Sequence, residues 1–205
     1  MPDRRRQRYG DMEYDWEHRV DTTSGTTGWR ERLLGLFHSP YQPTDAVLFR
    51  EMMAGLPIRS IRFEDFVFID IGSGKGRALL LASEYPFQKI VGVELLEELH
   101  RVAERNIRAY QNANEPSSRR IESIHADALD YDFPETAMVL YFFNPLPEPA
   151  LVRVLERLEK SIEQHPRAVW VVYHNPLLET ALRSCAWLSR VAGTEQYCIY
   201  KSLPR

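Results

Sequence analysis

The sequence predicts an α/β fold, with a single domain built on a mostly parallel sheet. Two observations lead to this prediction. From Phe66 onward, short apolar runs alternate with amphipathic helical segments, and a glycine-rich turn directly follows the first apolar run. Strands that alternate with helices are typical of βαβ units, whose strands lie parallel. The chain has 205 residues, of which 44% are hydrophobic, so it can bury one sizeable core and its length favours one domain over two.

Strands are expected where apolar residues run continuously, as a sheet covered on both faces requires. Five such runs lie at 66–69, 89–93, 121–125, 137–142 and 168–173. Only four residues separate two further strand-like runs, which is enough for a hairpin and too short for a helical crossover; these runs lie at 187–191 and 196–200. The sequence therefore predicts a seven-strand sheet that ends in a C-terminal antiparallel hairpin.

Helices are expected between the strands. One covers 78–82, and the next buries a stripe made of Leu96, Leu99, Val102, Ala103, Ile107 and Tyr110. Pro149 suits the first turn of a third helix, whose inward positions are Leu151, Leu155, Leu158 and Ile162. With helices on both faces of the sheet, the expected architecture has three layers.

The residues before Phe66 divide into two expected segments in front of a core that spans 66–205. Residues 1–28 are predicted to form a flexible arm because they combine the polar stretch 21–28 with arginines, which either form a solvated tail or contact the substrate: Arg4, Arg5, Arg6 and Arg8. Residues 29–65 are expected to form a helical segment that caps the core. It contains a short helix near 30–37 and another with Thr44 as N-cap and one face made of Val47, Leu48, Met52 and Leu56.

Charge and cysteine content narrow the classes of function. The net charge of −3 gives no broad positive field, so nucleic acid remains a possible partner that the charge does not favour. Cys185 and Cys198 are too few for a disulfide framework and lack metal-ligand spacing, so we expect no metal and a reducing, cytoplasmic location. No run approaches the roughly 20 apolar residues of a membrane span, so no membrane partner is expected.

A ligand-binding turn is predicted at the end of the first strand. Gly72, Gly74 and Gly76 allow positive φ and close approach of a ligand, and the helix behind them offers free N–H groups. A dinucleotide-binding turn needs its third glycine where Arg77 stands. Asp70 would repel a pyrophosphate but can accept hydrogen bonds from an ammonium group, so the turn favours a ligand with a cationic amino acid portion. The alternative is a purely structural tight turn.

Two further acids follow the next strands. Glu94 ends the second strand 22 residues after Gly72, close to the interval at which an acid accepts both hydroxyls of a ribose. Asp127 follows the third strand, where its carboxylate can accept from the amine of adenine while Ala128 packs near the ring. A surface glutamate and a loop-turn aspartate are the alternatives for the two acids.

Together these residues resemble the class I, seven-strand, Rossmann-like S-adenosylmethionine-dependent methyltransferases, from about Phe66 to the end of the chain. The resemblance implies S-adenosylmethionine as the cofactor. It also implies a role for each residue: the methionine portion is held by Asp70, Gly72, Gly74 and Gly76, the ribose by Glu94, and the adenine by Asp127 with Ala128.

The end of the fourth strand bears on the acceptor of the methyl group. Asn144-Pro145 looks like the Asn/Asp-Pro-Pro-aromatic motif of amino methyltransferases, which makes Asn144 and Pro145 the candidate catalytic residues. The match is partial, since Leu146 and Pro147 replace the second proline and the aromatic residue. The glycine turn, with Lys75 and Arg77, is also similar to that of seven-strand protein lysine methyltransferases. The alternative is that Asn144 and Pro145 merely end the strand.

Other candidates lie nearby. His174 follows the fifth strand and is either a general base or a structural residue. Tyr41 and Gln42 precede the helix that by analogy covers the cofactor. We therefore expect a methyltransferase that acts on a nitrogen of a protein, lysine-like acceptor. The alternatives are a nucleobase or small-molecule amine acceptor, a module that binds S-adenosylmethionine without catalysis, and a nicotinamide-dependent oxidoreductase.

Overall fold

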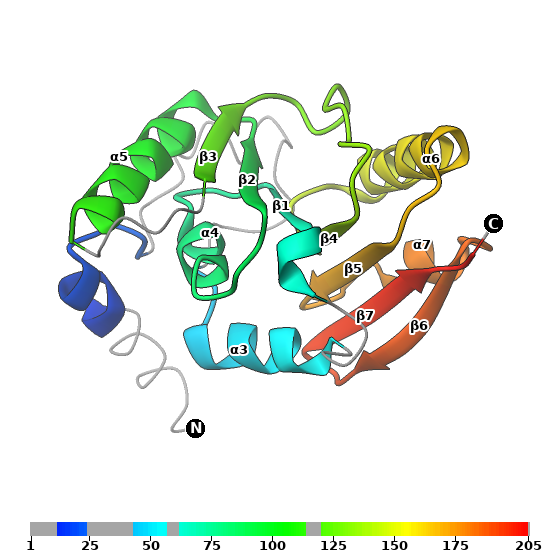
Figure 1. The fold of residues 1–205 in the computed structure, drawn as a ribbon, viewed down its shortest axis with the longest axis horizontal. Coiled ribbons are helices and arrows are strands. Elements are labelled where there is room, and N and C mark those ends of the chain that lie inside the picture. Colours follow the sequence, from blue (N-terminus) through cyan, green and yellow to red (C-terminus); the bar gives the residue numbers. More distant parts are fainter. Residues whose placement is uncertain (1–11, 24–42, 57–61, 114–119, 205) are drawn as a thin grey trace.

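Seven strands form one sheet in the order β3-β2-β1-β4-β5-β7-β6 (Figure 1). The computed structural model describes residues 12–23, 43–56, 62–113 and 120–204. The strands are β1 Val67–Ile71, β2 Lys89–Glu94, β3 Arg120–His125, β4 Met138–Phe142, β5 Val169–His174, β6 Leu188–Gly193 and β7 Tyr197–Ser202. Strands β1 to β5 pair in parallel, whereas β7 lies antiparallel to β5 and β6. The predicted α/β fold with a C-terminal antiparallel pair is confirmed.

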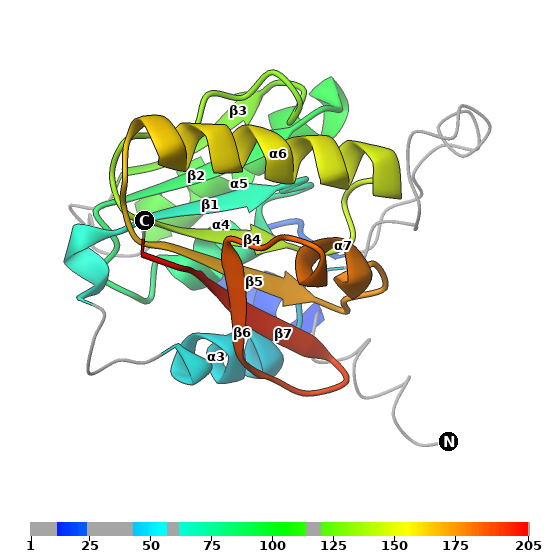
Figure 2. The ribbon, with the colours of Figure 1, turned by 90° about the vertical axis from the view of Figure 1, so that its right-hand side faces the viewer.

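Helices cover both faces of this sheet, which gives the predicted three layers (Figure 2). Alternate residues of β1 enter different cores, because Phe68 packs with one cluster and Ile69 and Ile71 with the other. On the Phe68 side lie α3 (Ala46–Gly55), α4 (Arg77–Ala82) and α5 (Glu97–Ala113), and on the other side lie α6 (Glu148–Gln164) and α7 (Glu179–Arg183). A 3-10 helix, Phe63–Asp65, leads into β1. Neither this turn nor α7 was predicted.

Helix α3 begins one residue later than the sequence predicts. Its N-cap is Asp45, whose carboxylate accepts a hydrogen bond of 2.8 Å from the Leu48 N–H. The prediction that Thr44 is the N-cap is wrong: its hydroxyl is buried, 3.3 Å from the Tyr141 hydroxyl. The predicted inward face is also rotated, since Val47 is 64% exposed and the larger ring of Phe49 is fully buried in its place.

The N-terminal residues that the structure describes are packed against the core. Residues 12–18 form a helix, and Tyr14 and Asp15 are buried. Over residues 12–23 the structure therefore differs from the predicted flexible arm. The rest of that arm, the helix expected near 30–37, and Tyr41 and Gln42 lie outside the described residues.

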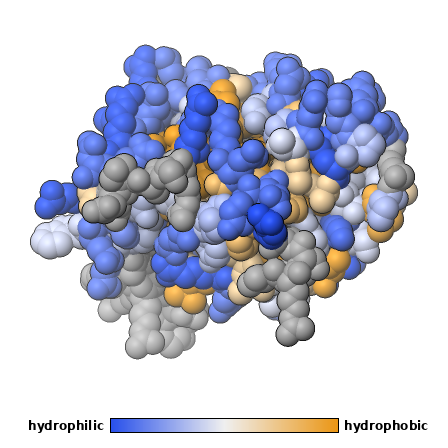
Figure 3. Space-filling model, in the orientation of Figure 1, coloured by the Kyte–Doolittle hydropathy of each residue, from blue (hydrophilic) through white to orange (hydrophobic). Residues whose placement is uncertain are grey.

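The outer surface follows the expected pattern. Hydrophilic residues dominate the face in Figure 3, including the region over α5, whose inward residues are Ala103, Asn106 and Ile107.

Within the described ranges no helix is long and apolar enough to cross a membrane. The same part of the chain holds no group of three or more metal-ligating side chains. Cys185 and Cys198 are both free thiols.

Candidate functional site

The predicted site residues gather at the carboxyl edge of the parallel strands. Asp70 lies beside Gly92 and Tyr141 in the sheet register, one residue before β1 ends. Glu94 ends β2 and pairs with His125 at the end of β3, and His174 ends β5. Because β1 to β5 run in the same direction, side chains far apart in the sequence meet at one edge, where ligands of open α/β sheets bind.

The glycine turn takes the backbone shape that its sequence predicts. Gly72, Gly74 and Gly76 have φ of 74°, 53° and 84°, a region that favours glycine. Gly76 is the N-cap of α4, and the N–H groups of Gly72 and Ser73 donate to the carbonyl of Val93 at 2.8 and 3.2 Å. The turn is therefore pinned to β2.

Space around Gly72 is as restrictive as its backbone angle. A Cβ atom at Gly72 would lie 2.3 Å from Cβ of Pro145. Pro145 thus packs directly over the glycine turn, and the two candidate elements, one after β1 and one after β4, meet at this contact. A side chain at position 72 would push them apart.

Glu94 holds the loops on both sides of it. The carboxylate is 2% exposed, and its Oε2 accepts from the Gly74 N–H at 2.7 Å while Oε1 accepts from the Leu96 N–H at 2.8 Å. The alternative of a surface glutamate is therefore wrong. Each carboxylate oxygen can accept a second hydrogen bond, so Glu94 keeps the capacity to receive hydroxyl groups.

Two carboxyl groups are buried side by side next to the turn. Burial and the nearby charge of Glu94 raise the pKa of Asp70 well above its ordinary value. Burial also raises the pKa of Glu94, against the lowering effect of its hydrogen bonds from Leu96 and Gly74. Two nearby negative charges repel each other. A cation that reaches this edge of the sheet is therefore attracted by both carboxyl groups.

The cations of the glycine turn bind residues of the N-terminal segment. Lys75 Nζ lies 2.8 Å from Oδ1 of Asp21 and 3.1 Å from the carbonyl of Thr23. The Arg77 guanidinium donates to the Thr22 hydroxyl at 2.9 Å and lies 3.5 Å from the Asp15 carboxylate. Sequence reasoning missed these partners, because nothing in the local pattern of residues 12–23 indicates a contact more than 50 positions away.

Asp127 has a local role in its loop. Its Oδ1 accepts a hydrogen bond of 2.8 Å from the Leu129 N–H, which is the turn geometry that short acidic side chains favour. The second carboxylate oxygen has no such partner in the chain's described hydrogen bonds, so the loop role and the predicted adenine role are compatible. Ala128 is 7% exposed and packs with the core on the α6 side.

Asn144 links the ends of β4 and β5. It is 7% exposed, and its Oδ1 accepts from the Tyr173 hydroxyl at 2.7 Å. Its Nδ2 donates to the carbonyl of Asn175 at 2.6 Å. Both asparagines have positive φ, 47° for Asn144 and 49° for Asn175, which is uncommon outside glycine. The bonds fix the orientation of the amide and leave one lone pair of Oδ1 for a further donor.

His174 is enclosed by aromatic side chains. Its ring stacks on Phe143 with centroids 3.8 Å apart, and Nδ1 lies 2.8 Å from the Tyr141 hydroxyl. Burial lowers the pKa of His174 to about 4, so the imidazole is neutral at physiological pH. If Tyr141 donates this hydrogen bond, the ring proton resides on Nε2, which then acts as a donor rather than as a base.

Solved structures of low sequence identity share this fold. A ribosomal protein L11 methylase from Lactobacillus delbrueckii subsp. bulgaricus aligns with a TM-score of 0.53 at 13% identity, covering 79% of this chain and 80% of its own. An RNA methyltransferase from Salinibacter ruber, solved with S-adenosyl-L-homocysteine, gives 0.51 at 20% identity, with 79% and 94% covered. Magnesium protoporphyrin IX methyltransferase from Synechocystis PCC 6803, with bound SAM, gives 0.52 at 11%, with 96% and 93% covered.

The chain has the class I methyltransferase fold. The strand order and the single antiparallel strand β7 agree with this assignment. No protein-family model matches the chain, and no curated protein matches it in sequence. At these identities the likeness establishes the fold and leaves the acceptor open.

The residues at the edge of this methyltransferase fold fit S-adenosylmethionine. Its sulfonium and ammonium groups are cations, and the buried pair Asp70 and Glu94 lacks a cation from the glycine turn because Lys75 and Arg77 bind residues 15–23. The fit rests on these two buried carboxyl groups beside a turn whose backbone a ligand can approach closely.

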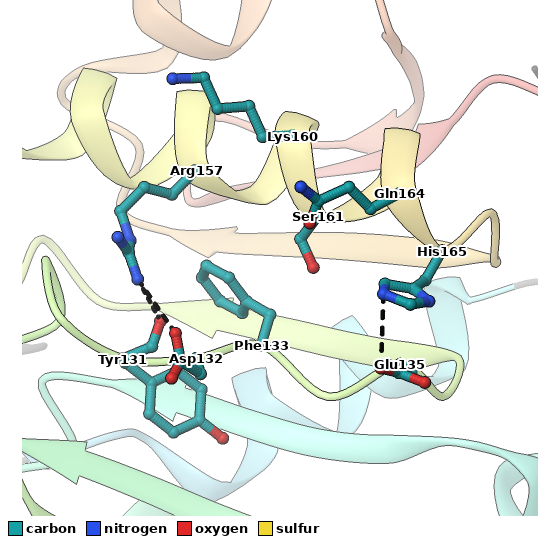
Figure 4. A pocket seen from close by; sticks show the side chains of 9 residues that line it. All are labelled: Tyr131, Asp132, Phe133, Glu135, Arg157, Lys160, Ser161, Gln164 and His165. Atoms are coloured by element: carbon teal, nitrogen blue, oxygen red, sulfur yellow. Dashed lines mark hydrogen bonds and ion pairs between the residues drawn. The ribbon is translucent and has the colours of Figure 1, made fainter.

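A separate hollow of about 300 Å³ lies between α6 and the loop after β3 (Figure 4). Arg157 points across it toward the carbonyl of Tyr131, and at its other end His165 Nε2 lies 3.4 Å from Oε1 of Glu135. Glu135 precedes β4 and His165 precedes β5, so this end of the hollow lies toward the edge where the strands begin. It is distinct from the acids of the carboxyl edge.

Proposed function

We propose that this protein transfers a methyl group from S-adenosylmethionine to a nitrogen atom of a protein side chain. The observation that carries the proposal is the pair of buried carboxyl groups, Asp70 and Glu94, next to the glycine turn, with raised pKa values. Such a pair is costly in an empty site and is stabilised by a cationic ligand.

Different residues would bind different parts of S-adenosylmethionine. Asp70 would accept from the ammonium group, the backbone of Gly72 to Gly76 would lie along the methionine portion, and Glu94 would receive the ribose hydroxyls with its remaining lone pairs. Asp127 would accept from the adenine amine with the oxygen that does not bind Leu129. When bound, S-adenosylmethionine supplies a methyl group on a sulfonium, which is an excellent leaving group.

Residues after β4 and β5 would orient the acceptor. Alignment of the nucleophile with the methyl group supplies most of the rate enhancement in such a transfer, so little acid–base help is needed. Asn144 is held rigidly by Tyr173 and Asn175, and its free Oδ1 lone pair is suited to accept an N–H of the acceptor amine. His174 ends the neighbouring strand β5 as a neutral imidazole, so it would add no positive charge to this edge, which favours the neutral, nucleophilic form of that amine.

We propose a protein acceptor for two reasons: the net charge of the chain is negative, and its glycine turn is similar to that of protein lysine methyltransferases. The net charge of −3 lacks the field that helps a protein bind nucleic acid phosphates. The solved structures with this fold include enzymes described as acting on a ribosomal protein, on RNA and on a porphyrin, so the fold does not choose among acceptors. A nucleobase or small-molecule amine is the alternative.

Calorimetry with S-adenosylhomocysteine tests the cofactor. We expect binding to the wild-type chain, and tighter binding than that of NADH, whose pyrophosphate the two acids repel. Tighter binding of NADH would favour the oxidoreductase alternative. Absence of S-adenosylhomocysteine binding would contradict the proposal.

Transfer of a radiolabelled methyl group to cell lysate tests the reaction and the acceptor. Lysate is treated separately with protease, with nuclease and by size filtration. We expect the labelled product to be lost after protease treatment and retained after nuclease treatment. Nuclease-sensitive label would indicate a nucleic acid acceptor, and label that passes the filter a small molecule. Cofactor binding without transfer to any fraction would favour a non-catalytic module.

A further inference from the structure

Asn106 is a buried amide at a position where an apolar residue is expected. It lies on the inner stripe of α5 between Ala103 and Ile107 and is 4% exposed. A buried side-chain amide is destabilising unless its donors and acceptor are paired. Its presence in this stripe therefore points to specific partners.

Among the described residues, the Asn106 amide bonds to backbone groups of two other segments. Nδ2 donates to the carbonyl of Lys75 and to that of Asp21, both at 2.9 Å, while Oδ1 accepts from the Asp21 N–H at 2.8 Å. Lys75 lies between Gly74 and Gly76, so one side chain binds the middle of the glycine turn and the N-terminal segment at the same time. Both amide hydrogens are used.

The side chains of Lys75 and Arg77 also join the glycine turn to the N-terminal segment. Lys75 forms an ion pair with Asp21. The Arg77 guanidinium donates a hydrogen bond to Thr22 and lies 4.1 Å above the ring of Tyr14. Asp15 in turn accepts from the N–H groups of Thr22 and Thr23 at 2.8 and 2.7 Å. Residues 14–23 are therefore bound to the glycine turn through the side chains of Lys75 and Arg77.

A glycine-rich turn loses more conformational entropy on ordering than any other kind of segment. If the turn were loose, a ligand would have to order it on binding, and its affinity would fall accordingly. The bonds of Asn106 to the carbonyl of Lys75 and to the backbone of Asp21 order the turn before a ligand arrives.

We infer that Asn106 is a positioning residue for the cofactor site: it holds the glycine turn in its binding shape and couples the docking of residues 14–23 to cofactor affinity. The inference rests on the proposed function. It follows that loss of the amide weakens cofactor binding and loosens the N-terminal segment together.

The test compares Asn106→Leu, which keeps the size of the side chain, with Arg105→Ala on the exposed face of the same helix. Calorimetry measures S-adenosylhomocysteine affinity, and hydrogen exchange measures protection of residues 12–23. We expect Asn106→Leu to lose affinity about tenfold or more, the size of effect that one to two buried hydrogen bonds produce. Protection of residues 12–23 should fall in the same variant, and Arg105→Ala should resemble the wild type in both.

Equal affinity in the wild type and in Asn106→Leu overturns the inference and leaves the proposed function standing. If the wild-type chain does not bind S-adenosylhomocysteine, both the proposed function and this inference are wrong. If Asn106→Leu does not fold, Asp15→Asn provides the test, because it weakens the contacts of the N-terminal segment without changing a residue that bonds to the backbone of the glycine turn. The S-adenosylhomocysteine affinity of Asp15→Asn should fall together with the protection of residues 12–23. Unchanged affinity with lost protection would show that docking of these residues is not coupled to cofactor affinity.

Discussion

The Asn144 side chain donates a hydrogen bond of 2.6 Å to the backbone carbonyl of Asn175, and both residues have positive φ. The ends of β4 and β5 are thus tied together by a residue that adopts a conformation costly for most side chains. This relationship gives Asn144 a structural role that is compatible with the catalytic role proposed for it.

Asn144→Ala separates the two roles. It removes both hydrogen bonds and places alanine at a φ of 47°, so we expect a loss of about 1 to 3 kcal/mol in the free energy of unfolding. Turnover should fall well below that of the wild type while S-adenosylhomocysteine affinity is retained. Chemical denaturation and the methyl transfer assay measure the two effects, and Asn144→Gly tolerates the backbone angle and serves as a control. Full turnover in the folded alanine variant would restrict Asn144 to its structural role.

Asp70→Asn should improve stability and impair binding. A carboxyl group whose pKa is raised on folding contributes stability at low pH that is lost as the pH rises through that raised pKa. At neutral pH the buried carboxyl group therefore destabilises the fold, and an uncharged amide does not. We expect the chain without ligand to gain about 1 kcal/mol in the free energy of unfolding. Its affinity for S-adenosylmethionine should fall at least tenfold, because the ammonium group loses its carboxylate partner. Thermal unfolding and calorimetry measure both changes, with the exposed Asp130→Asn as control. Unchanged affinity would remove Asp70 from the ligand site.

The pH dependence of stability reports on His174. Its pKa of about 4 in the folded state lies below the ordinary 6.5, so its contribution to stability is present above pH 6.5 and is lost as the pH falls toward 4. The loss over this range is roughly 3 kcal/mol. In His174→Gln, which can still accept from the Tyr141 hydroxyl, denaturation at a series of pH values should show a correspondingly shallower slope. An equal slope in both proteins would show that His174 is not buried as a neutral ring.

Gly72→Ala should disrupt the contact between the glycine turn and Pro145. The new Cβ would lie 2.3 Å from Cβ of Pro145 at a φ of 74°, so we expect a loss of about 2 kcal/mol or more in stability, together with weaker cofactor binding. Adding Pro145→Gly removes the clash but not the backbone strain, so the double variant should recover part of the stability. A double-mutant cycle by chemical denaturation measures this coupling. Strictly additive losses would mean that the two loops are not in contact.

The sheet, its antiparallel end and the shape of the glycine turn could all be predicted from local patterns in the sequence. Apolar runs, helical stripes and glycine spacing are local patterns, and the backbone angles at Gly72, Gly74 and Gly76 are those that the spacing indicated. Local steric and burial preferences act between near neighbours in the chain, so they can be predicted without knowledge of the packing.

The pairing of the buried polar groups, in contrast, became visible only in the folded chain. The bonds of Asn106 to Lys75 and Asp21, and those of Asn144 to Tyr173 and Asn175, join residues separated by 29 to 85 positions. Such pairings depend on how helices and loops settle against the sheet, and a buried amide looks the same in sequence whatever it binds. The physical reason is that hydrogen bonds are short-ranged and directional, so their partners are fixed only when the backbone is already in place.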